Sequence, residues 1–321
     1  MTSHPDFYDP GTNDTLWIER AAVVTASAAA RRKRDHSSRA DDDDVRICAF
    51  GIDCQVAFCT PGASLFVPGA VDDTTRTLDF LYRHIDRLTG LVFSLDTHNA
   101  FQVFHPAWWV DASGAHPPPM TTISHDDVVT GRFIPRGTRE AALDYTRQLE
   151  ASGRYVLTIW PYHGLLGGLS HALVPSLMEC ALYHSVLRDQ PTRFEQKGTQ
   201  PLTENYSVLA PEVTSINGSV VGAFNDALFD HLMSFDRIYV FGQAKSHCVP
   251  ATLRDLHLRL QHDPSSLAKI YILEDCMSPV PAPPLSPLPP GLDFPRLADE
   301  AIAAFRAAGM NVVKSTDPIA V

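Results

Sequence analysis

From Val45 onward, short runs of β-branched and aromatic residues alternate with longer segments of helical period. Alternation this regular predicts a doubly wound α/β fold, in which a mostly parallel sheet carries helices on both faces. The expected strands are 45–52, 90–95, 155–160, 193–196, 237–242, 269–273 and 311–314. The expected helices lie near 72–88, 138–151, 170–188, 219–234, 247–261 and 296–308.

Three segments interrupt this rhythm. Residues 1–44 carry the opposed charge blocks RRKR and DDDD, and we expect an extension that is partly disordered or lies on the surface of a single domain, 45–321. Residues 99–137 are rich in Pro, His and Trp, and we expect a long loop insertion there. The proline-rich segment 280–295 is expected to be an extended connector, with a docking ligand for a proline-reading domain as the alternative.

Charge and cysteine content exclude several classes of protein. A formal charge of −11, from 26 basic and 37 acidic residues, argues against nucleic acid as a partner. Six sparsely spaced cysteines favour a reducing cytoplasm over a secreted disulfide scaffold. No apolar run approaches the roughly 18 residues of a membrane helix. A small molecule is therefore the expected partner, and the sequence leaves room for a homo-oligomer.

Polar residues follow the predicted strands at the sheet edge where parallel α/β folds bind ligands. Asp53 follows the first strand, where burial suits a carboxylate to proton transfer, although a turn cap is the plain alternative. Lys197 follows 193–196, where it either supplies positive charge to a nucleophile or is simply solvated at a turn.

A second group of polar residues has the character of metal ligands. Asp96 and His98 stand two residues apart after 90–95, so both side chains point to one side of an extended segment. His105 follows in the same stretch, and His163 follows 155–160. One carboxylate with several imidazoles suits a divalent transition metal, with zinc the leading candidate and iron or manganese also compatible.

Cys248 opens the helix that follows 237–242, in the turn GQAKSHC. The positive end of the helix dipole would favour its thiolate, and free backbone N–H groups in the turn could bind an oxyanion. The alternatives are a buried core cysteine, to which cysteine is prone, and a redox role, which the lack of a C-x-x-C pair disfavours.

Taken in order, these motifs resemble the nicotinamidase branch of the isochorismatase-like cysteine hydrolases. The resemblance rests on GIDCQVAFCTPGASLFVPGA, LDTHNAFQVFHPAWW, WPYHG, FEQKG, FGQAKSHCVPAT and EDCMSPV, and it spans roughly 45–278. It implies a three-layer α/β/α fold with a six-stranded sheet. It also implies that Gly164 departs from the family, which often has cysteine after the WP-x-H histidine.

The resemblance assigns roles to individual residues. It implies a catalytic triad of Asp53, Lys197 and Cys248 and an oxyanion hole from the N–H groups of Ala244 and Cys248. It further implies metal binding by Asp96, His98 and His163, with His105 as a fourth candidate, and a pyridine ring held between Phe58 and Trp160. In this family the bond equivalent to Gln243–Ala244 is often cis.

The activity implied is hydrolysis of nicotinamide to nicotinate and ammonia, a step of NAD salvage, with the metal orienting the pyridine ring. Three alternatives stay open at this point. They are a related amidase acting on a ureido or maleamate-type substrate, a vinyl-ether hydrolase of the isochorismatase type, which would not use Cys248, and a catalytically silent binding subunit.

Overall fold

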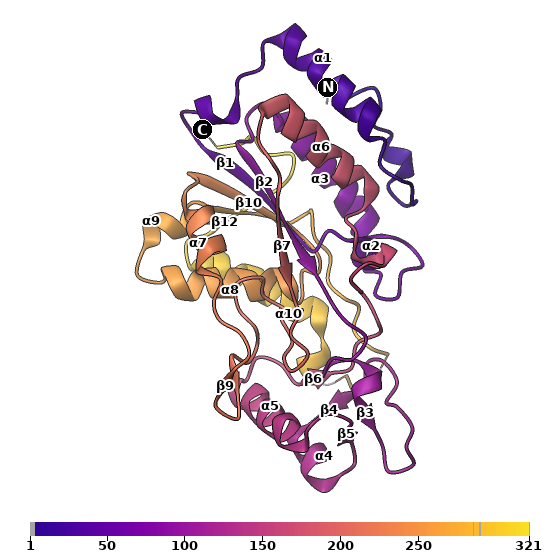
Figure 1. Cartoon of the computed structure of the whole chain (residues 1–321). Coiled ribbons are helices and arrows are strands. Elements are labelled where there is room, and N and C mark those ends of the chain that lie inside the picture. The colour runs from indigo at the N-terminus through magenta and orange to yellow at the C-terminus, as the bar shows by residue number, and fades with distance from the viewer. Residues whose placement is uncertain (1–3, 285, 289, 321) are drawn as a thin grey trace.

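A six-stranded parallel sheet forms the centre of the molecule, in the order β12-β11-β10-β1-β2-β7 (Figure 1). The computed structural model describes residues 4–284, 286–288 and 290–320. The strands are β1 (Ile47–Ile52), β2 (Gly90–Asp96), β7 (Arg193–Lys197), β10 (Arg237–Gly242), β11 (Ile270–Leu273) and β12 (Asn311–Val313). The predicted doubly wound α/β fold is confirmed.

Strand β1 shows why the sequence folds into layers. Its six residues are all buried, and their side chains alternate between the two faces of the sheet. Cys48 and Phe50 join the hydrophobic core on one face, while Ile47 and Ala49 join the core on the other. A strand buried on both faces reads as a continuous apolar run, which is what ICAFGI shows.

Helices cover both faces of this sheet (Figure 1). One face carries α3 (Ala70–His84) and α6 (Pro175–Arg188), and the other carries α8 (Cys248–Leu260) and α10 (Phe294–Ala307). The remaining helices are α1 (Ala21–Asp35), α2 (Val56–Cys59), α4 (His125–Thr130), α5 (Arg139–Ser152), α7 (Asp226–Met233) and α9 (Pro264–Leu267). No helix in the described part of the chain has the length and apolar character needed to cross a bilayer.

The prediction of a strand at 155–160 was wrong as regards the central sheet. Only β6 (Leu157–Thr158) is extended there, and it pairs antiparallel with β4 (Thr122–Ile123), outside that sheet. The apolar pattern of 155–160 arises because the segment packs against the insertion. His163 therefore lies in a loop and not at the end of a central strand.

Two further expectations need correction. The insertion 99–137 is not a structureless loop, because it contains β4, α4 and the antiparallel pair β3 (Trp109–Val110) and β5 (Ile134–Pro135). The expected helix 219–234 begins only at Asp226. The residues before it form a hairpin of β8 (Ser215–Ile216) and β9 (Ser219–Val220) around Asn217 and Gly218, which both have positive φ.

The N-terminal extension lies over the outer surface of α6 in its described part, residues 4–44 (Figure 1). Val24 and Ala28 of α1 are fully buried against the domain. Arg31 pairs with Asp86, and Arg32 pairs with Asp189. Residues 1–3 of this extension, 285 and 289 of the proline-rich segment, and 321 lie outside the described residues.

The strand order places one junction of the sheet at its centre. The chain runs from β1 outward through β2 to β7 and then returns to β10 on the other side of β1. Ligands of open α/β sheets bind beyond the carboxyl ends of the strands where the order reverses in this way. That junction lies between the ends of β1 and β10, at Ile52 and Gly242.

Candidate active site

The turn after β10 brings Cys248 to this junction. Gly242 has a φ of 120°, and a Cβ there would lie 2.0 Å from the carbonyl oxygen of Ile52, so only glycine fits. The Gln243–Ala244 bond is cis, as the family resemblance implied. Cys248 is the first residue of α8, at the position where the sequence predicted it.

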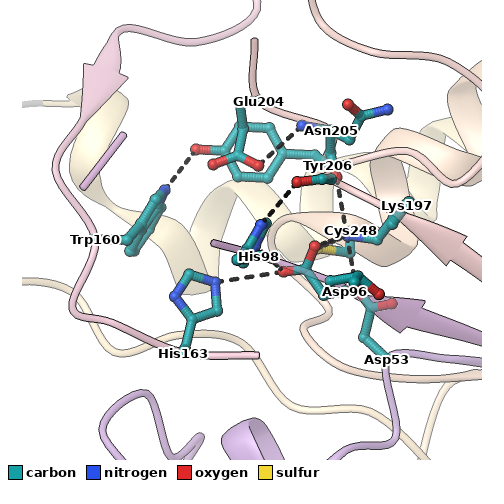
Figure 2. Close-up of polar contacts among 12 residues, drawn as sticks. Asp53, Asp96, His98, Trp160, His163, Lys197, Glu204, Asn205, Tyr206 and Cys248 are labelled. Carbon is teal, nitrogen blue, oxygen red and sulfur yellow. Dashed lines mark hydrogen bonds and ion pairs between the residues drawn. The ribbon is translucent and has the colours of Figure 1, made fainter. Parts of the chain in front are cut away.

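Lys197 joins the parts of the site (Figure 2). Its Nζ lies 3.0 Å from Oδ2 of Asp53, 2.8 Å from Oδ1 of Asp96 and 3.6 Å from Sγ of Cys248. It also donates a hydrogen bond of 2.8 Å to the carbonyl oxygen of Asn205. Because the Lys197 side chain is buried, this ammonium compensates two buried carboxylates at once.

Asp53 is held rigidly at the end of β1. Its Oδ1 accepts a hydrogen bond of 2.6 Å from the hydroxyl of Ser94, and its own N–H donates to the same Ser94 oxygen at 3.0 Å. The backbone of Asp53 has a φ of 48°, in the left-handed region that aspartate tolerates better than most residues. The carboxylate is thereby aimed at Lys197 and the base of α8.

Burial controls the proton affinity of the three central groups. It raises the pKa of Cys248 well above the usual value, and the positive charge of Lys197 only partly opposes this. Burial also raises the pKa of Asp53, against the opposing charge of Lys197. Burial therefore opposes the resting thiolate that the position of Cys248 at the start of α8 suggested from the sequence.

Asp96, His98 and His163 form a compact group of buried donor atoms, all within 4.8 Å of one another. Nε2 of His98 lies 2.9 Å and Nε2 of His163 lies 3.3 Å from Oδ2 of Asp96. Each histidine has its Nδ1 on a backbone carbonyl oxygen, that of Gly198 for His98 and that of Pro161 for His163. Such bonds place the proton on Nδ1 and turn the lone pair of Nε2 inward.

His105 stands beside this group without belonging to it. Its ring centre lies 5.7 Å from that of His98 and 5.9 Å from that of His163. Its Nδ1 contacts the carbonyl oxygen of Asn99 at 3.0 Å, and its buried Nε2 has no hydrogen-bond partner among the described residues. The three grouped donors of Asp96, His98 and His163 fit a divalent transition metal, and the unpartnered Nε2 of His105 lies next to them.

A small pocket opens beside these groups. Its free volume in this structure is about 30 Å³, small beside typical small-molecule sites, so its walls lie close together. Phe58 and Trp160 line it, as do Cys248 and Ala244. Trp160 is held by a hydrogen bond of 3.0 Å from its Nε1 to the hydroxyl oxygen of Tyr206 (Figure 2). Aromatic side chains, the thiol of Cys248 and two of the metal-type donors, Asp96 and His163, thus line one small pocket.

The overall structure is similar to solved nicotinamidases. The Acinetobacter baumanii nicotinamidase/pyrazinamidase matches with a TM-score of 0.53 at 18% identity, over 86% of this chain and 99% of that one. The yeast nicotinamidase matches with a TM-score of 0.52 at 18% identity, over 83% and 99%. The chain therefore shares the fold of these solved enzymes. No family model and no curated protein sequence matches this chain significantly.

Within the nicotinamidase fold, the pocket contains residues that sequence reasoning missed. The most polar is Glu204, which is buried and lines the pocket on the side of His98 (Figure 2). Burial raises its pKa, although the charge of His98 opposes the shift. It lies seven residues after Lys197 in an irregular stretch that has no periodicity to mark it. The other unpredicted lining residues are Leu65, Tyr206, His247 and Val280.

Gly164, which departs from the nicotinamidase pattern, has a structural reason to be glycine. Its φ is 54°, and a Cβ there would lie 2.5 Å from the carbonyl oxygen of Asp96. The carbonyl oxygen of Gly164 accepts a hydrogen bond of 2.9 Å from the N–H of His98. The loop carrying His163 is therefore pressed against the strand end that carries the other two donors.

Proposed function

We propose that this protein is a cysteine amidohydrolase whose substrate is nicotinamide, converted to nicotinate and ammonia. One observation carries the proposal: Lys197 contacts Asp53, Asp96 and Cys248 together, at the wall of a small aromatic pocket. The nicotinamidase fold supports it, as does the yeast nicotinamidase solved with the inhibitor nicotinaldehyde.

In the first half of the reaction, the carboxylate of Asp53 takes the thiol proton of Cys248, and the sulfur bonds to the amide carbon. The backbone N–H groups of Ala244 and Cys248 stabilise the resulting oxyanion, with about 3 kcal/mol per donor in comparable sites. Within residues 4–284, 286–288 and 290–320, no hydrogen bond engages either N–H group. Asp53 then returns the proton to the leaving nitrogen, and ammonia departs.

The second half regenerates the thiol. Asp53 accepts a proton from water as the water oxygen bonds to the thioester carbon, and it passes that proton to the sulfur as the carbon–sulfur bond breaks. The product acid loses its own proton to solvent and leaves as the carboxylate. Asp96, His98 and His163 would hold the metal, with His105 as the candidate for a fourth ligand, and zinc suits this donor set first. The bound cation would bind the pyridine nitrogen and orient the ring.

The decisive experiment measures ammonia release from nicotinamide by wild type and by Cys248→Ala. We expect turnover by wild type, loss of turnover in the variant, and equal metal content in both proteins by elemental analysis. Substantial turnover by Cys248→Ala would exclude the thioester route.

A panel of other amides and a chelator separates the neighbouring functions. Turnover of ureido or maleamate-type amides without nicotinamide turnover would assign a different substrate, and a purified protein free of metal would point the same way. Complete inactivity of a metal-loaded protein would favour a binding subunit.

A further inference from the structure

The side chain of Gln243 is fixed at both of its ends. Its Nε2 donates a hydrogen bond of 2.8 Å to Oδ2 of Asp73, and its Oε1 accepts one of 3.3 Å from the N–H of Ser278. Its backbone N–H donates to the carbonyl oxygen of Ile52 at 2.8 Å. Gln243 is almost fully buried, so none of these bonds competes with bulk water.

Asp73 is the buried charge at the far end of this arrangement. It lies on α3, its side chain is 3% exposed, and its other oxygen receives Arg76 at 2.6 Å. Burial raises the pKa of Asp73, while hydrogen bonds from Ser278, Gln243 and Arg76 lower it. Asp73 does not line the pocket beside Cys248.

Ser278, in the segment after β11, makes the third set of contacts in this arrangement. Its carbonyl oxygen accepts a hydrogen bond of 2.9 Å from the N–H of Lys245, one residue beyond Ala244. Ser278 also lies close to the start of α3, because a Cβ on Gly69 would be only 2.5 Å from its hydroxyl oxygen. Contacts from α3 and from this segment thus hold both sides of the peptide group that contains the Ala244 N–H.

We propose that Asp73 is a positioning residue, which acts through Gln243 to hold the Ala244 N–H where the oxyanion of the substrate forms. The inference rests on the proposed amidase function. Held in advance, the donor needs no reorganisation when charge develops, so its benefit falls on the transition state more than on substrate binding. Loss of the arrangement should lower kcat and leave KM nearly unchanged.

The test exchanges donor and acceptor across the Asp73–Gln243 bond. Gln243→Glu places two carboxyl groups against each other, and Asp73→Asn leaves either Gln243 or Arg76 facing an amide N–H, because the amide has one acceptor oxygen where the carboxylate has two. The double variant Asp73→Asn/Gln243→Glu restores the donor–acceptor match with reversed polarity, because the Asn amide can donate to the new carboxylate while Ser278 still donates to it. Asp72→Asn, at an exposed neighbour on the same turn of α3, is the matched control.

We expect kcat for nicotinamide to fall at least tenfold in each single variant with KM within threefold. We expect it to return to within threefold of wild type in the double variant. Alkylation of Cys248 by iodoacetamide, which forms no oxyanion, should proceed equally in all five proteins. Wild-type kcat in both single variants, or a double variant no better than the singles, would overturn the positioning role. A wild type that releases no ammonia from any amide would overturn the proposed function itself, and this inference with it.

Discussion

At the scale of single residues, Gly198 determines how closely the donor atoms of Asp96 and His98 can pack. Gly198 follows Lys197 with a φ of 77°, and a Cβ there would lie 2.6 Å from Cε1 of His98 and 3.0 Å from Oδ1 of Asp96. The ring and the carboxylate occupy the space that any other residue would need. Gly198 contributes no donor atom, but its lack of a side chain leaves room for the ring of His98 and the carboxylate of Asp96.

Gly198→Ala should lower metal content and nicotinamide turnover at least tenfold, because the new methyl group displaces His98. Gly114→Ala is the matched control, since Gly114 has a φ of 83° but a Cβ added there would meet no described atom within 4 Å. Both changes carry the backbone cost of a positive φ, about 1–2 kcal/mol. Metal stoichiometry by elemental analysis separates them, and equal metal content in the two variants would contradict the crowding of His98.

Glu212 should make stability depend on pH. Burial raises its pKa to about 7, while Arg154 lowers it and Asp255 and Glu204 raise it. A carboxyl group whose pKa is raised in the folded state stabilises the fold most at pH values below its pKa in the unfolded chain. This contribution to the free energy of unfolding is lost as pH rises through about 7, the pKa of Glu212 in the folded protein. Ionisation of Glu212 should lower the free energy of unfolding of wild type by about 1–3 kcal/mol between pH 4.5 and pH 8.

Glu212→Gln should abolish that part of the pH dependence, as measured by urea unfolding at pH 5 and pH 8. The exposed Glu140→Gln serves as the control and should leave the difference between the two pH values intact. If Glu212→Gln and wild type lost equal stability over this interval, the carboxyl of Glu212 would not be the group responsible.

At the scale of elements, α1 holds to the domain by one face. Val24 is fully buried, whereas the neighbouring Val23 is 54% exposed. The helix has a strongly charged C-terminal turn, in which Arg31 and Arg32 pair with acidic residues of the domain. Its attachment depends on tertiary contacts, because isolated helices of this length are marginal in water.

Val24→Asp should detach α1 by placing an unpaired carboxylate in its buried face. Trypsin should then cut within 31–34 several times faster than in wild type, as followed by mass spectrometry. Val23→Asp should change the cutting rate little. Equal acceleration by both changes would indicate that the helix is open to the protease regardless of its packing.

Helices and strands were predicted well where the hydrophobic residues had a clear period. They were predicted poorly where the structure depends on short antiparallel strand pairs, such as β4 with β6 and β8 with β9. All six strands of the central sheet were predicted, and in inner strands such as β10 the run IYVFG is buried on both faces. The segment 155–160 has the same composition but finds its partner in the insertion, which no local pattern reveals. The 215–220 hairpin carried an Asn-Gly turn signal that the helix prediction for 219–234 overlooked.

The site follows the same logic. Residues at strand ends, such as Asp53 and Cys248, could be predicted because a parallel sheet brings its carboxyl edges together. Glu204 could not, because an irregular segment carries it to the pocket and only the folded chain shows its direction. The proton affinity of Cys248 also escaped prediction, since burial depends on the complete structure.

At the scale of the whole molecule, two hydrophobic cores share one sheet. Leu78 of α3 lies fully buried in one, and Leu253 of α8 lies fully buried in the other. The sheet between them is one element thick, so the cores have different helices but common strands. Their independence can be measured by how mutational effects combine.

Leu78→Ala and Leu253→Ala should each cost about 2–5 kcal/mol of unfolding free energy, as buried leucine truncations do. The double variant should lose the sum to within about 0.5 kcal/mol, since the two side chains belong to separate cores. Urea unfolding of the three variants provides the measurement. A clear excess over the sum would show that the strands transmit strain from one face to the other.

The pairing of the N-terminal extension with distant residues has a consequence for biosynthesis. Asp43 pairs with the fully buried Arg188, 145 residues later in the chain, and Arg20 pairs with Glu179, 159 residues later. During translation the extension is made before the surface that binds it, so it stays in solvent while some 150 further residues are added. Its charged, alanine-rich composition exposes little apolar surface during this interval. The extension can therefore dock only after most of the domain has been synthesised.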